Sequence, residues 1–226
     1  MGNHQEPNFG YLLGGILTFM LVGPIARQLF GSVDGLIMMG AFTAMMLISV
    51  WSLVANRLVF FSGLLLALTS IALAIINYYY PNQVLIFALM AILLVFILLS
   101  ASLANTHLFG DSSISANRLM GGICIYLLIG LSWSIMYATL VLIDPLSFSG
   151  ISITDGFLIT DNGPIFWETT YFSFVTLTTL GYGDITPITS GAKALAYTEA
   201  VAGQLYIAVL VGALVGGYIS EKRSNN

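Results

Sequence analysis

The stretch TLTTLGYGDITP, Thr176–Pro187, is the most informative part of this sequence. It places three threonines, two glycines and a tyrosine close together, just before an aspartate. Glycine loses more conformational freedom on folding than any other residue, and it weakens helices and strands alike. Such a composition indicates a place where accessible backbone matters more than packed side chains.

The composition of the whole chain is that of an integral membrane protein. Of its 226 residues, 58% are hydrophobic and 7% are charged, and the mean hydropathy is +0.96. A soluble domain carries about 25% charged residues. The net charge of −4 provides no basic surface for nucleic acid. No HExxH motif, Cys/His cluster or serine-nucleophile motif occurs, so we do not expect an enzyme.

Six segments are apolar enough to cross a bilayer, which takes about 20 residues. They are Phe9–Phe30, Leu36–Val54, Leu58–Ile76, Val84–Ala104, Leu119–Ile143 and Ile188–Ser220. The breaks between the first five are short, and no soluble ligand-binding domain is inserted. Six crossings place both termini on one side, and the arginines and lysines at the ends of the segments favour the cytoplasm for that side. We therefore expect a multi-pass protein of the cell membrane, surrounded by lipid, with both termini cytoplasmic.

The chain between the last two crossing segments is unusual. A polar loop of 20 residues, Asp144–Gly163, precedes an apolar segment, Pro164–Thr178. Pro164 suits the first position of a helix. A helix over this segment would be about 22 Å long, which is too short to span the bilayer. The sequence therefore predicts a short re-entrant helix that leads directly into the glycine-rich stretch.

Irregular backbone at membrane depth is tolerated only where it is buried in protein or lines a watery path. In the stretch Thr178–Gly183, each residue can turn its carbonyl toward a common axis. Four copies of the chain would then stack rings of oxygens that replace the hydration shell of a cation. We expect Gly181 and Gly183 to take backbone angles that other residues resist. Leu180 and Tyr182 should point away from the axis and pack behind the strand.

The run TTLGYGD, Thr178–Asp184, resembles the potassium-channel signature, and Pro187 follows it at the expected place. Over Leu119–Ser220 the chain is similar to bacterial potassium channels with six transmembrane helices. The resemblance implies an all-α homotetrameric channel with a re-entrant pore helix and a selectivity filter between helices five and six. It divides the chain into a four-helix domain (1–104), a linker (105–118), a pore domain (119–220) and a short cytoplasmic tail (221–226). The pore domain comprises an outer helix (119–143), a turret (144–163), a pore helix (164–178), a filter (179–184) and an inner helix (188–220).

The resemblance also implies roles for single residues. The filter would coordinate permeant K⁺ without an organic cofactor, through Thr179, Leu180, Gly181, Tyr182 and Gly183, with the ions at the first four. Five residues would support it: Thr178, Tyr171, Phe172, Asp184 and Glu199. Phe172 stands where the family often has a tryptophan that bonds to the filter aspartate, and Val175 replaces a frequent glutamate. We therefore expect Asp184 to be less restrained than in the family.

The last segment carries further candidates. The resemblance places Gly203 at the hinge of the inner helix, although close helix packing is an equal alternative. Four residues at helical spacing share one face and are expected to line a cavity or gate, with a packing stripe as the alternative: Gln204, Ile207, Val211 and Val215. Glu199 is an ionisable residue inside a membrane segment, and we expect it to bond to a threonine or tyrosine of the pore helix. A role in proton sensing is the less favoured alternative.

The fourth apolar segment has no charged residue, so we do not expect a voltage sensor. The favoured function is a potassium-selective channel. The alternatives are a less selective cation channel and a non-conducting regulatory membrane subunit.

Overall fold

The computed structural model describes residues 9–30, 57–108, 116–151 and 163–224, which form six helices and one two-stranded sheet. The helices are α1 (Phe9–Phe30), α3 (Arg57–Tyr79), α4 (Gln83–Leu108), α5 (Ala116–Ile143), α6 (Gly163–Leu177) and α7 (Ser190–Ser224). The strands are β1 (Phe148–Ser149) and β2 (Thr186–Pro187), which pair antiparallel. Among these described elements, five helices are long and apolar enough to span a membrane: α1, α3, α4, α5 and α7. The predicted second helix, Leu36–Val54, lies outside the described residues.

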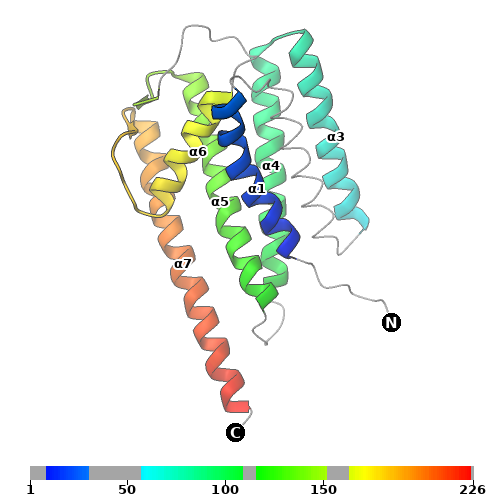
Figure 1. Ribbon diagram of the computed structural model, residues 1–226, viewed down its shortest axis with the longest axis vertical. Coiled ribbons are helices and arrows are strands. Elements are labelled where there is room, and N and C mark those ends of the chain that lie inside the picture. The colour runs from blue at the N-terminus through cyan, green and yellow to red at the C-terminus, as the bar shows by residue number, and fades with distance from the viewer. Residues whose placement is uncertain (1–8, 31–56, 109–115, 152–162, 225–226) are drawn as a thin grey trace.

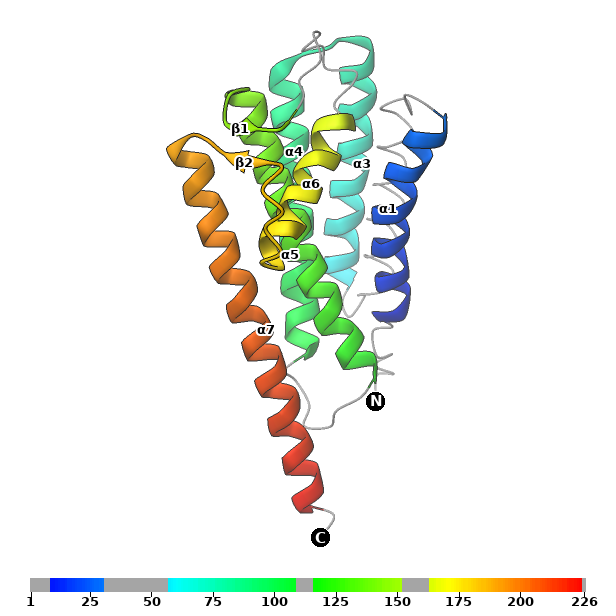
Figure 2. The same ribbon diagram turned by 60° about the vertical axis from the view of Figure 1, so that its left-hand side comes forward.

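The long helices form a bundle and run along it in two opposite directions (Figures 1 and 2). α1, α3 and α5 run one way along the bundle, and α4 and α7 run the other way (Figures 1 and 2). The beginning of α1 and the end of α7 therefore lie toward the same end. α6 begins at the opposite end and descends only to the middle of the bundle, and the chain after it returns to the end at which α7 begins (Figure 1).

The helix boundaries differ from the predicted ones mainly where polar residues flank an apolar run. The first helix was predicted correctly at both ends. α4 and α5 extend into the predicted linker, to Leu108 and from Ala116, and α7 continues to Ser224 in the predicted tail. In α7 this extension contains Glu221, Lys222 and Arg223, which are good helix formers and continue a helix beyond its apolar part. α7 begins two residues later than predicted, at Ser190, because the Thr189 hydroxyl accepts a hydrogen bond from the Ala192 N–H and caps the helix.

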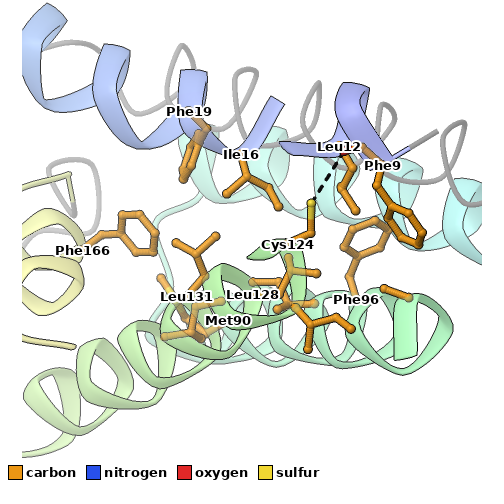
Figure 3. Close-up of a cluster of buried hydrophobic side chains, with 14 of the residues drawn as sticks. Phe9, Leu12, Ile16, Phe19, Met90, Phe96, Cys124, Leu128, Leu131 and Phe166 are labelled. Carbon is orange, nitrogen blue, oxygen red and sulfur yellow. Dashed lines mark hydrogen bonds between the residues drawn. The ribbon is translucent and has the colours of Figure 1, made fainter. Parts of the chain in front are cut away.

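The main core lies between α1, α4 and α5. Buried side chains from these helices and from Phe166 of α6 point toward one another (Figure 3). On α1 they follow the helical spacing of a single face: Phe9, Leu12, Ile16 and Phe19. Cys124 of α5 is fully buried among them, as a small apolar residue would be, and its thiol donates to the Phe9 carbonyl.

The first helix also positions α6. The rings of Phe19 and Trp167 lie 5.2 Å apart. A Cβ at Gly23 would lie 2.1 Å from the Trp167 ring, so α1 can approach α6 this closely only with a glycine there. α6 is thus packed between α1 and α5, and its C-terminal end is directed into the bundle.

Candidate functional site

The end of α6 determines the conformation of the segment after it. The Leu180 N–H donates to the Val175 carbonyl and the Thr179 N–H to the Thr176 carbonyl, each over 2.9 Å. This pair of bonds is a Schellman motif, which requires a left-handed residue at the position that Thr179 occupies. Thr179 has a φ of 59°, which is unusual for a β-branched residue. The predicted end of this helix at Thr178 is one residue too late, since α6 ends at Leu177.

Three alternate residues after α6 have positive φ angles. They are Thr179 at 59°, Gly181 at 62° and Gly183 at 81°. The expectation that both glycines take angles closed to other residues is confirmed, whereas the angle of Thr179 was not predicted. Within the ranges that the structure describes, the carbonyls of Thr178–Gly183 accept no hydrogen bond. All six residues are exposed in the single chain.

Aromatic side chains restrain the far end of this segment. The hydroxyl of Tyr171 donates to Asp184 Oδ2 over 2.7 Å, and the Tyr171 and Tyr182 rings are stacked at 6.4 Å. The bond holds the pKa of the Asp184 carboxyl below its usual range and raises the pKa of Tyr171 to about 12. The expectation that Asp184 is less restrained is therefore wrong, because Tyr171 supplies the donor.

Phe172 lies on another side of α6. Its ring contacts Tyr137 at 5.0 Å and Phe148 at 5.1 Å, in a buried cluster that joins α5, β1 and α6. Phe172 therefore supports α6 itself rather than Asp184. The chain between α6 and β2, residues 178–185, is called the returning segment. Consecutive helix residues point about 100° apart, so only one of Tyr171 and Phe172 can face this segment.

Leu180 and Tyr182 border an open cleft of about 390 Å³ between α1, α6 and the returning segment. Its other walls include Met20 and Pro24 of α1 and Trp167 of α6. Leu180 is 55% exposed and Tyr182 66% exposed. A single chain therefore covers the side chains of Leu180 and Tyr182 only in part, although both are predicted to pack behind their strand.

The two-stranded sheet fixes the segment after Asp184. β1 pairs with β2, and the Ile188 N–H donates to the Ser147 carbonyl over 2.8 Å. Gly150, with a φ of 90°, lies so close to Asp184 that a Cβ would be 2.1 Å from the Asp184 carbonyl oxygen. The sequence predicts a loop over 144–163 and gives no indication of β1, because a strand of two residues has no periodic pattern.

Gly203 of α7 lies against the end of α6. A Cβ there would be 2.6 Å from the Leu177 carbonyl oxygen, which also accepts a bond of 3.3 Å from the Tyr126 hydroxyl. Close packing therefore accounts for this glycine. A Cβ at Gly212 or Gly216 would meet nothing within 4 Å in the described chain, so packing inside one chain does not account for them.

Glu199 is completely buried between α5, α6 and α7. Its carboxyl group contacts the Ser173 hydroxyl of α6 at 2.5 Å and the Tyr137 hydroxyl of α5 at 2.6 Å. The expected bond to α6 is present, but its partner is a serine rather than a threonine or tyrosine. Tyr137 was missed, because a tyrosine in an apolar helix has the pattern of an ordinary core residue.

The residues predicted to line a cavity lie together along α7. All four are exposed in the single chain: Gln204, Ile207, Val211 and Val215. Neither α5 nor α6 covers this face, which is therefore open to water, lipid or another protein surface.

Comparison with known proteins identifies the region that contains this site. Residues 123–216 match a family model described as "Ion channel". The chain carries an ion channel domain. The match runs from α5 through α6 and the returning segment to α7, less than half of the chain, and it does not extend over α1, α3 and α4. No match was found among curated proteins.

Proposed function

We propose that this protein is a potassium-selective channel that conducts K⁺ passively through a pore at the centre of a homotetramer. In this proposal α6 is the pore helix, Thr179–Asp184 the selectivity filter and α7 the inner helix. The carbonyls of Thr179, Leu180, Gly181, Tyr182 and Gly183 bind dehydrated K⁺, and Thr178, Tyr171 and Asp184 stabilise their strand.

The observation that carries the proposal is the backbone of Thr178–Gly183, whose carbonyls accept no hydrogen bond from the described residues and whose φ angles are positive at alternate residues. In an ordinary extended strand, successive carbonyls point to opposite sides. A change in the sign of φ at every second residue turns every second peptide and brings the carbonyls toward one side. Carbonyls without a partner are unfavourable away from water, and a dehydrated cation is the ligand that satisfies them.

The same observation supports four copies of the chain. A single strand offers oxygens on only one side of an ion, whereas K⁺ needs oxygens all around it. The described residues contain one such strand, so we infer that other copies supply the remaining ligands. The open cleft beside Leu180 and Tyr182 agrees with this, because a second copy would enclose it.

Other features of the ion channel domain suit a cation. The C-terminal end of α6 points into the bundle, and the partial negative charge of a helix C-terminus favours cations nearby. Gln204, Ile207, Val211 and Val215 then line the cavity below the filter. The beginning of α1 and the end of α7 lie toward the same end of the bundle, which agrees with the proposal that both termini are on the cytoplasmic side of the cell membrane.

The decisive experiment is ion flux through purified protein in liposomes. We expect flux of K⁺ and Rb⁺ well above that of Na⁺, with a reversal potential that follows K⁺ in bi-ionic recordings. Equal K⁺ and Na⁺ permeability would favour the less selective cation channel, and absence of all flux would favour a regulatory subunit. Gly181→Ala tests the backbone: a Cβ there meets nothing within 4 Å in the single chain, so within the chain its effect comes from the φ of 62°. We expect it to abolish selective conduction.

A further inference from the structure

Glu199, Ser173 and Tyr137 form a polar cluster in the interior of the ion channel domain. All three residues are 0% exposed. Ser173 Oγ lies 2.5 Å from Glu199 Oε1, and the Tyr137 hydroxyl lies 2.6 Å from Glu199 Oε2. The cluster joins α5, α6 and α7 at a single point.

The hydrogen atoms available to this cluster can be counted. Ser173 Oγ also lies 2.8 Å from the Gly130 carbonyl oxygen of α5. A hydroxyl group has one hydrogen to donate, and an ionised carboxylate can only accept. If Glu199 were ionised, Ser173 could bond to Glu199 or to Gly130, but not to both.

A protonated Glu199 removes this conflict. Its Oε1–H donates to Ser173 Oγ, the Ser173 hydrogen goes to the Gly130 carbonyl, and Tyr137 donates to Oε2. Each short contact then contains one hydrogen atom. Ser134 also donates to the Gly130 carbonyl from within α5, at 3.0 Å. Ionisation would therefore remove one hydrogen bond between α6 and α5, while the Gly130 carbonyl would keep Ser134 as a partner.

The surroundings of Glu199 also favour the neutral acid. A buried carboxylate is strongly unfavourable unless a cation or several donors compensate it. In the described part of the chain, the polar groups that bond to Glu199 are Ser173 from α6 and Tyr137 from α5. Tyr126 of α5, whose hydroxyl bonds to the Leu177 carbonyl, is a further titratable group that interacts with Glu199 electrostatically. None of these groups is a cation.

We propose that Glu199 is protonated at neutral pH and that the neutral acid is a positioning residue, which fixes α6 against α5 and α7. Loss of its proton to water at alkaline pH turns the Ser173 hydrogen toward Glu199 and breaks the bond to Gly130. α6 then loses a link to α5, and the strand that continues from α6 loses support. The consequence for conduction rests on the proposed function, whereas the protonation state does not.

The protonation state can be measured by infrared spectroscopy of the purified full-length protein in lipid at neutral pH. We expect the wild-type minus E199Q difference spectrum to contain the carbonyl stretching band of a protonated carboxylic acid. Tyr137→Phe removes the donor to Oε2 and should shift this band to higher wavenumber, which also provides a second variant should E199Q not fold. A wild-type protein without the band, or a band that Y137F leaves unmoved, would overturn the proposal.

Flux measurements test the consequence separately. Glutamine keeps a donor for Ser173 and an acceptor for Tyr137 but cannot ionise. We expect wild-type K⁺ flux to fall at alkaline pH and E199Q flux to stay constant over the same range. An equal alkaline loss in both proteins would contradict the positioning role. If neither protein conducts while the infrared band is present, the proposed function fails and the protonated Glu199 stands.

Discussion

The hydroxyl of Tyr171 donates a hydrogen bond to the Asp184 carboxylate over 2.7 Å, and this bond joins the middle of α6 to the far end of the strand that returns from it. Thirteen positions separate the two residues in sequence. They meet because the Schellman motif at Thr179 reverses the chain. The proposed filter is thus held at its inner end by the cap of α6 and at its outer end by Tyr171.

Loss of this bond should make the channel more sensitive to acid. The bond lowers the pKa of Asp184, so its stabilising effect is complete above the ordinary carboxyl pKa of about 3.9 and is lost as pH falls through the lowered pKa. In Tyr171→Phe the pKa returns toward its ordinary value. We expect the midpoint of acid-induced loss of K⁺ flux to move to higher pH.

The matched control is Tyr197→Phe, which changes an exposed tyrosine of α7 in the same way. It should keep the wild-type midpoint. A Y171F midpoint that coincides with that of Y197F would show that the Asp184 bond does not stabilise the conducting state.

Gly203 should be intolerant of a side chain for reasons of packing. Gly203→Ala forces a Cβ against the Leu177 carbonyl, and overpacking of this kind costs about 1–3 kcal/mol. Gly212→Ala is the control, since its Cβ meets nothing in the described chain and alanine is favoured in a helix by about 1 kcal/mol or less. We expect thermal unfolding of the purified protein to occur at lower temperature in G203A only. Unchanged stability of G203A, together with altered opening, would instead favour the hinge.

The sequence predicts some of these features better than others. The bounds of α1 and the angles of Gly181 and Gly183 follow from local composition, because an apolar run and a glycine each constrain their own residues. The positive φ of Thr179 follows from the hydrogen bonds that end α6, and the identity of the residue as threonine does not predict it.

The pairing of Glu199 with Ser173 and Tyr137 depends on the packing of three helices. A serine or tyrosine in an apolar helix does not indicate which residue it will bond to. The sequence places Phe172 at the position of the family's tryptophan, whereas Tyr171 bonds to Asp184, because the rotation of α6 about its axis decides which aromatic residue faces Asp184.

The exposed face of α7 should contain the gate. If Val211 and Val215 form an apolar constriction, Val211→Asn or Val215→Asn admits water and raises the open probability in single-channel recordings. Val209→Asn is the control, because it lies about 200° around the helix from Val211. A similar effect of all three changes, or no effect of any, would mean that this face is not a gate.

The channel should respond only weakly to voltage. Moving one elementary charge through the membrane field yields about 2.3 kcal/mol per 100 mV, and steep gating needs several such charges in each subunit. α4 contains no lysine, arginine, aspartate or glutamate, and α3 has only Arg57, at its first residue. The segment 36–54 has none of these residues in its sequence, and Arg27 lies near the end of α1.

α1 and α4 pack directly on α5, so we assign these two helices a structural role and not a role in voltage sensing. We expect conductance–voltage curves in symmetric potassium to be nearly flat. A steep, saturating activation curve equivalent to several gating charges per channel would refute this and would require charge movement from a source other than α3 and α4.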